Sequence, residues 1–424
     1  VRRSGDHLQA SARASPPLST TGSVRRSGDH MQAKGSWADG PPLSCIFAKA
    51  LAQAPVEKPV ALKVAGRVSF KQVTDDGAAL KEGGPVRPYW RRVKELWLNS
   101  CELGDEAGAE LLEALARRSE ASSALRVLSL EDNGLVEMPE IGSLTQLLEL
   151  NVWNNKLATL PDSIGGLCCL TALRTWKNCL TTLPESLGEL AALRELRLEC
   201  NKLTALPASL ARLDELRELH VWSNCLTALP GRLRLVELRE LHLEGNRLSA
   251  LPDCLENLVE LLHADLSNNA LEGLPPSICD LSELQRLRLS HNALSTLPDS
   301  LGQLFNLREL HLSHNRLTAL PQSIGELASL TELCVDDNKL SSLPESLGQL
   351  DRLSILRVDR NEISSLPECL GQMSSLRELS LQGNLLGALP ENLRQLAEES
   401  GLLIEYDIPL MGYEDREEAS ASSS

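Results

Sequence analysis

Seven side chains that are typical of binding surfaces recur at nearly constant intervals along the chain. They are Trp153, Arg174, Trp176, Arg197, His220, Trp222 and His242. Tryptophan offers a large apolar area for stacking and arginine offers a fixed fork of hydrogen-bond donors, so both are enriched where proteins bind proteins. If the chain repeats with a period near 23 residues, these side chains lie close together on neighbouring repeats. We therefore predict that they form a partner-binding patch.

The other reactive side chains form no pattern that predicts catalysis or a cofactor. The sequence has no G-x-x-x-x-G-K-[ST], G-x-S-x-G or H-E-x-x-H motif, and Cys168–Cys169 is its only pair of adjacent cysteines. His291 and His314 hold equivalent positions, but a zinc site needs at least three protein ligands, and no cysteine is clearly placed to complete one. We predict that the chain is not an enzyme and has no catalytic residue, cofactor or metal.

The elements that position the patch follow from a repeated leucine frame. The stretch Leu193–Leu203 reads L-x-x-L-x-L-x-x-N-x-L. The frame begins again, at steps of 22 or 23 residues, at Leu125, Leu147, Leu170, Leu193, Leu216, Leu238, Leu261, Leu284, Leu307, Leu330, Leu353 and Leu376. A period this regular predicts a leucine-rich repeat solenoid.

Each repeat contains a short strand, a polar corner and an outer turn. The L-x-L strand can bury its leucines only against neighbouring repeats, so the strands should stack into one parallel sheet. The recurrent asparagine, as at Asn201, can satisfy backbone groups at the corner, and the following Leu-Pro pair interrupts regular structure. We predict an α/β fold: an open arc with a concave parallel β-sheet and a short helical or irregular convex side. Thirteen strands at ~4.8 Å spacing give an inner face roughly 58 Å long.

The outward strand positions should form columns along the concave face. One column holds Arg174, Arg197, His220 and His242, and the next holds Trp153, Trp176 and Trp222. A third column is rich in glutamate, as at Glu195 and Glu218, and we interpret it as a solvated face. An acidic group at Asp336, Asp337 and Asp359 is interpreted as salt-bridged surface.

Composition and charge divide the chain into four parts. Residues 1–58 are predicted to be a basic, largely disordered tail, in which Val1–Ala10 returns almost unchanged at Val24–Ala33. Residues 59–92 are predicted to cap the N-terminal edge, 93–400 to form about 13 repeats, and 401–424 to form a C-terminal cap and an acidic, serine-rich tail. Residues 89–424 carry a net charge of −22, which argues against nucleic-acid binding by the solenoid.

The outer half of several repeats reads L-P-x-S-[LI]-G-x-L-x-x-L, as in Leu183–Leu193. Over residues 125–400 this resembles the intracellular Ras-group leucine-rich repeat family, which includes Shoc-2, the Ras suppressor proteins and the plant Ras-group-related proteins. The resemblance implies a non-enzymatic scaffold that binds a small GTPase, a phosphatase or another signalling protein on its concave face. The first repeat, Val93–Leu115, resembles the longer ribonuclease-inhibitor type instead, with a true helix outside.

Other features predict a cytoplasmic protein. No segment approaches the 18 apolar residues of a membrane span, and there is no N-x-S/T sequon and no paired cysteine framework. Because the sequence begins with Val1 rather than methionine, a second hypothesis is that it is the substrate-targeting region of a larger ligase or kinase. A third is a purely structural array without a specific partner.

Overall fold

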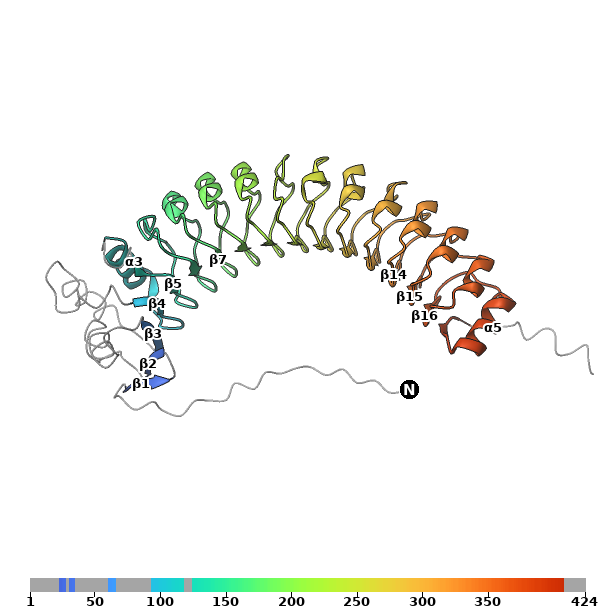
Figure 1. Cartoon of the computed structure of the whole chain (residues 1–424), viewed down its shortest axis with the longest axis horizontal. Coiled ribbons are helices and arrows are strands. Elements are labelled where there is room, and N and C mark those ends of the chain that lie inside the picture. Colours follow the sequence, from blue (N-terminus) through green and yellow to red (C-terminus); the bar gives the residue numbers. More distant parts are fainter. Residues whose placement is uncertain (1–22, 28–29, 35–59, 66–92, 118–123, 408–424) are drawn as a thin grey trace, which may run out of the picture.

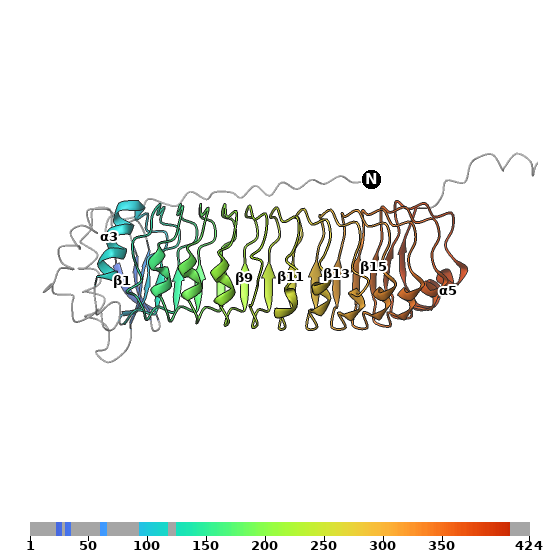
Figure 2. The same ribbon diagram turned by 90° about the horizontal axis from the view of Figure 1, so that it is seen from above.

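The computed structural model describes residues 23–27, 30–34, 60–65, 93–117 and 124–407. The chain forms an open arc whose strands line the inner side and whose helical turns lie on the outer side (Figure 1). Seen from above, the repeats stack one behind another as parallel layers (Figure 2). The predicted solenoid with a concave parallel sheet is confirmed.

The inner sheet is built from one short strand per repeat. Parallel strands follow in chain order: β4 (Val93–Trp97), β5 (Val127–Ser129), β6 (Glu149–Asn151), β7 (Ala172–Arg174), β8 (Glu195–Arg197), β9 (Glu218–His220), β10 (Glu240–His242), β11 (His263–Asp265), β12 (Arg286–Arg288), β13 (Glu309–His311), β14 (Glu332–Cys334), β15 (Ile355–Arg357), β16 (Glu378–Ser380) and β17 (Leu403–Glu405). Equivalent residues pair without a shift, as Leu196 does with Leu219. Residues one repeat apart in the sequence therefore lie side by side and form straight columns across the sheet.

Three further strands extend the sheet at the N-terminal end. β3 (Val60–Ala65) pairs in parallel with β4, and β2 (His30–Lys34) pairs with β3. β1 (Ser23–Ser27) and β2 form an antiparallel hairpin inside the segment that we predicted to be largely disordered. The rest of the predicted tail and cap, and the acidic tail after residue 407, lie outside the described residues.

The core is a continuous stack of leucines that runs the length of the arc. Leu196 and Leu198 of one repeat are fully buried, and so are Leu216 and Leu219 of the next, to within 2%. Full burial of such a side chain contributes about 1.5–3 kcal/mol. Since each repeat buries its leucines only against its neighbours, the stack as a whole stabilises the fold.

A ladder of asparagines closes the corner of each repeat. The Asn201 amide donates hydrogen bonds to the carbonyls of Thr175 and Leu198, at 3.1 and 2.9 Å, and its Oδ1 accepts one from Leu180 N–H at 3.0 Å. The residue just before each corner often takes a left-handed backbone, as Cys200 does at φ 55°. The structural role predicted for the asparagines is confirmed for those that the structure describes.

The outer side consists of short 3-10 turns between two terminal helices. The turns are η2 (Asp162–Gly166), η3 (Glu185–Glu189), η4 (Ala208–Arg212), η5 (Leu255–Asn257), η6 (Pro276–Asp280), η7 (Leu301–Gln303), η8 (Gln322–Glu326), η9 (Glu345–Gln349) and η10 (Glu368–Gln372). The preceding proline is extended, as at Pro184, and its carbonyl accepts from Leu187 N–H to start the turn. A Cβ at Gly188 would lie 2.4 Å from the Ser209 carbonyl oxygen, so glycine lets successive turns pack closely.

The two terminal helices replace these turns where the stack begins and ends. α3 (Gly104–Ala116) buries Leu111, Leu112 and Leu115, as the first repeat predicted. α5 (Glu391–Ser400) ends at Gly401, which adopts a left-handed conformation at φ 70°. Within the described residues, neither of these helices nor any other is both long and apolar enough to cross a bilayer.

Candidate functional site

The predicted tryptophans lie in one column beside strands β6 to β9. Trp153 and Trp176 stack almost in parallel, with ring centroids 4.0 Å apart and an interplanar angle of 6°. The Lys177 ammonium lies 5.0 Å from the Trp176 centroid and 5.8 Å from that of Trp153. All three predicted tryptophans are partly exposed, but Trp222 lies two strands from Trp176, with Glu199 between them. The patch therefore has one stacked pair and one separate ring.

The two predicted arginines lie in the adjacent column and are held by the glutamate column on their other side. Arg174 donates to both oxygens of Glu195, at 2.9 and 2.5 Å, and to Glu149 at 3.1 Å. Arg197 also donates to Glu195, at 2.5 Å, and to Glu218 at 3.4 Å. Burial alone would raise the pKa of Glu195, but the hydrogen bonds from both arginines hold it below its usual value.

These ion pairs give the arginine column and the glutamate column different roles from those that the sequence predicted. The interpretation of the glutamates as a merely solvated face is wrong at Glu195, whose side chain is 19% exposed and pairs with two arginines. The guanidinium group of Arg174 already donates its hydrogen bonds to carboxylates. A partner would therefore meet the edge of this group and its aliphatic chain rather than free donors. The two arginines thus form a charged surface beside the tryptophans, held in place by ion pairs.

The predicted histidines form a second stacked pair. The rings of His220 and His242 lie 4.5 Å apart at 8° to each other. Burial lowers the pKa of His220 to about 4, and the nearby His242 and Arg197 add to that effect. The Glu244 carboxylate, whose Oε2 lies 3.7 Å from His242 Nδ1, raises the pKa of His242. At neutral pH the buried ring is therefore uncharged, although it lies among carboxylates.

Two carboxylates that the sequence analysis did not single out flank Trp222. Glu199 and Glu244 are the next residues in its column, and each has a buried Oε2 without a hydrogen-bond partner among the described residues. Glu199 is only 3% exposed, and burial raises its pKa. Their places in the column beside Trp222 are readable from the sequence, but their burial depends on how the neighbouring rings pack.

Two trios of side chains in the described part of the chain have metal-ligand chemistry. They are His220, Glu240 and His242, and His311, Glu332 and Cys334, each with its ligand atoms within 4.8 Å of one another. The pair that the sequence singled out, His291 and His314, stacks at 4.1 Å, and His314 faces Asp337 at 3.4 Å. The expected salt bridge of the acidic group is present between Arg360 and Asp337.

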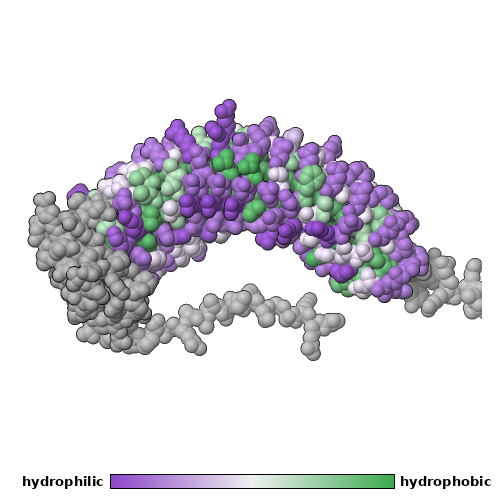
Figure 3. All heavy atoms as spheres, in the orientation of Figure 1, coloured by the Kyte–Doolittle hydropathy of each residue, from purple (hydrophilic) through white to green (hydrophobic). Residues whose placement is uncertain are grey.

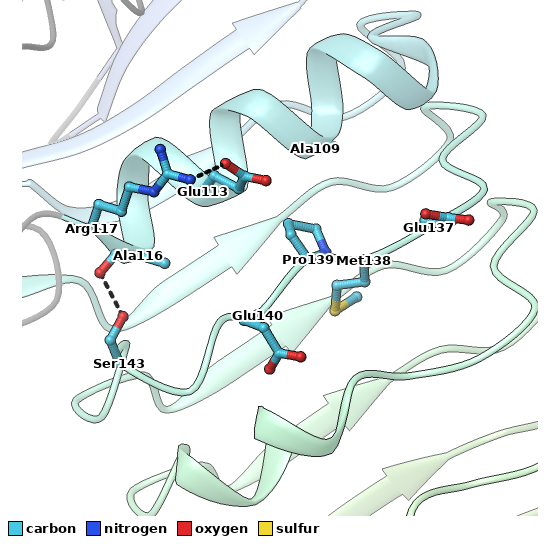
Figure 4. A pocket seen from close by; sticks show the side chains of 9 residues that line it. All are labelled: Ala109, Glu113, Ala116, Arg117, Glu137, Met138, Pro139, Glu140 and Ser143. Carbon is cyan, nitrogen blue, oxygen red and sulfur yellow. Dashed lines mark hydrogen bonds and ion pairs between the residues drawn. The ribbon is translucent and has the colours of Figure 1, made fainter.

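The described part of the chain has a hollow on each side of the arc. A shallow one of about 140 Å³ adjoins His242 on the concave face and includes His263, Asp265 and Arg288. A larger one of about 590 Å³ lies on the outer side, between α3 and the Met138–Pro139 turn (Figure 4). In the larger hollow Arg117 is paired with Glu113, at 2.7 Å. In side view the arc's surface is mostly hydrophilic, with small apolar areas spread along it (Figure 3).

Comparisons with known proteins agree with this architecture. A family model described as a leucine-rich repeat region matches residues 120–229 and 295–406, which is slightly more than half of the chain, and a leucine rich repeat model matches 236–294 and 260–317. A search of curated proteins returns no match.

Several solved structures share the fold. A leucine-rich repeat protein of Leptospira interrogans is 28% identical over 85% of this chain and 98% of its own, with a TM-score of 0.53. The plant peptide hormone receptor RGFR1, in complex with RGF2, is 27% identical over 83% of this chain and 58% of its own, with a TM-score of 0.64. PEPR1, crystallised with AtPEP1, is 30% identical over 74% of this chain and 45% of its own, with a TM-score of 0.63.

The repeat frame, the single parallel sheet and the family match lead to one conclusion. Proteins of this fold commonly serve as protein-interaction modules. The chain belongs to the leucine-rich repeat family.

Proposed function

We propose that this solenoid is a non-enzymatic scaffold that binds a protein partner on its concave face. The observation that carries the proposal is the stacked Trp153–Trp176 pair, which stays partly exposed on the inner face. Large aromatic rings beside a fixed charged surface are typical of binding hot spots, because they bury much apolar area at little cost in side-chain freedom. Arg174, Arg197, His220, Trp222 and His242 complete the proposed contact surface.

The chemistry of the face indicates what kind of partner it fits. The three columns from β6 to β10 combine tryptophan, paired arginine and carboxylates over several strands, a surface much larger than a small metabolite needs. The RGFR1 and PEPR1 structures are complexes with RGF2 and AtPEP1, which supports a polypeptide partner. The acidic charge of the solenoid argues against nucleic acid.

We also propose a cytoplasmic, signalling role of the Ras-group type. The outer L-P-x-S-[LI]-G motif supports this, as at Leu183–Gly188, where glycine packs the turn against Ser209. The described cysteines from Cys168 to Cys369 are free thiols, which fits a reducing compartment. The partner would then be a small GTPase, a phosphatase or another signalling protein.

The proposal predicts that removing the tryptophans abolishes partner capture without unfolding the chain. In the Trp153→Ala/Trp176→Ala/Trp222→Ala variant the core leucines are untouched, so the circular dichroism spectrum should match that of the wild type. Hot-spot residues contribute about 2 kcal/mol or more each, so affinity for a captured and then purified partner should fall more than roughly a hundredfold. The measurement is affinity capture with mass spectrometry, followed by titration with the purified partner.

A matched control removes exposed apolar side chains elsewhere. Val259→Ala/Phe305→Ala changes residues that are 49% and 57% exposed and lie outside the concave columns. This variant should bind as the wild type does. Equal binding by the wild type and the triple variant would overturn the proposed face.

A further inference from the structure

The distal half of the concave face holds a second cluster that the proposed function does not use. His311 is the last residue of β13, and Glu332 and Cys334 lie on the neighbouring strand β14. The parallel register places His311 directly opposite Cys334. Because residues 332 and 334 lie on the same face of their strand, the three side chains meet above the sheet.

The distances among the ligand atoms suit a tetrahedral metal ion. His311 Nε2 lies 3.5 Å from Glu332 Oε1, and Cys334 Sγ lies 3.4 Å from the same oxygen. Zinc bonds of ~2.0–2.3 Å at tetrahedral angles place neighbouring ligand atoms roughly 3.3–3.6 Å apart. The third distance, between nitrogen and sulfur, is within 4.8 Å. Small rotations of the imidazole would therefore complete the geometry.

Neither flanking arginine forms an ion pair with this trio in the described part of the chain. The imidazole Nε2 of His311 is buried and has no hydrogen-bond partner among the described residues. The arginines on either side are occupied, because Arg288 faces Asp265 and Glu309 while Arg357 donates to Glu378 at 2.8 Å.

The other trio in the described residues fits a metal less well. The His220 and His242 rings are stacked and nearly parallel, so the in-plane lone pairs of their nitrogens point side by side rather than toward one point. A single ion could bind both imidazoles only if the stack were broken.

We propose that His311, Glu332 and Cys334 form a zinc-binding site, with water as the fourth ligand. One nitrogen, one carboxylate oxygen and one thiolate match zinc's preferred ligands, and a site with three protein ligands keeps an open position. On binding, a bond forms between the metal and Sγ, the S–H bond breaks and its proton passes to solvent. The site shares no residue with the tryptophan patch, so it stands or falls independently of the proposed function.

The test is cobalt and zinc titration of the reduced full chain. Cobalt bound by a thiolate gives an intense near-ultraviolet charge-transfer band, which a site of histidine and carboxylate alone does not give. We expect this band for the wild type, with zinc displacing the cobalt. Cys334→Ser should abolish the band, and His311→Ala should weaken zinc binding by roughly a hundredfold or more, above the 10–100-fold cost typical of losing an outer-shell partner.

Two matched controls keep the result interpretable. Cys225→Ser removes another free cysteine and His242→Ala removes a ligand of the other trio, and neither should change the cobalt band. Cys334→Ser is nearly isosteric, and its circular dichroism spectrum should match that of the wild type. A wild-type protein that binds cobalt without the band, binds no metal, or keeps the band in Cys334→Ser would overturn the proposal.

Discussion

Replacing Asn201 with alanine should lower the free energy of unfolding by about 3–5 kcal/mol. The side chain is 8% exposed, and its amide bonds to the carbonyls of Thr175, Leu198 and Glu199. Its Oδ1 accepts from Leu180 N–H of the preceding repeat. Alanine leaves the buried Leu180 N–H without its acceptor, which costs about 1–3 kcal/mol. It also removes hydrogen bonds of about 0.5–1.5 kcal/mol each from the three carbonyls, which keep Asn178, Asn224 and Lys177 as donors. Because Asn201 joins two neighbouring repeats, the loss also weakens their interface.

Urea unfolding followed by circular dichroism measures this loss. Asn306→Ala is the matched control, because its exposed amide makes one bond, to the Ser282 carbonyl at 2.8 Å. We expect that variant to lose about 1 kcal/mol or less. If Asn201→Ala unfolded at the same urea concentration as the control, the hydrogen bonds of the corner asparagines would not stabilise the repeats in this way.

Acid should destabilise the solenoid through His220. Its folded pKa, about 4, lies below its ordinary value of 6.5 because burial disfavours the charged ring. Between these pH values the unfolded chain binds the extra proton and the folded chain does not, so stability rises with pH. This contribution is complete above pH ~6.5 and declines as pH falls toward ~4, with a loss of about 2–3 kcal/mol. His242, its partner in the stack, has the opposite effect on stability, because Glu244 raises the pKa of His242. Protonation of His242 therefore favours the folded state as the pH falls.

The two histidines therefore make a matched pair of variants. His220→Gln should flatten the fall in unfolding free energy between pH 6.5 and pH 4.5, whereas His242→Gln should steepen it. Urea unfolding at several pH values gives the comparison. Identical pH dependence of both variants and the wild type would show that the stacked pair does not control acid stability.

Much of the architecture could be predicted because the repeat period sets the register. Equal repeat lengths place Arg174 beside Arg197 and Trp153 beside Trp176, and the structure pairs the strands in that way. Corner asparagines and extended prolines are also local features that each repeat carries in its own residues. The β1–β2 hairpin was not predicted because its residues lack the repeated leucine pattern that marks the other strands.

The contacts between columns could not be predicted in the same way. Arg174 can reach carboxylates on two neighbouring strands, and its choice of Glu195 and Glu149 depends on side-chain rotamers rather than on spacing. Cys334 lies opposite His311 on the next strand, yet its closeness to Glu332 requires both side chains to turn toward each other. Periodicity thus predicts which columns are adjacent, and packing decides which atoms meet.

The central claim is that a partner covers the concave tryptophans, and radical footprinting with mass spectrometry tests it most directly. Trp153, Trp176 and Trp222 are partly exposed in the free chain and should be oxidised there, as should Phe305 outside the concave columns. With the captured partner bound, oxidation of the Trp153–Trp176 pair should fall several-fold while that of Phe305 stays the same. Protection of Phe305 with unchanged tryptophan oxidation would contradict the account and place the binding surface on the outer side of the arc.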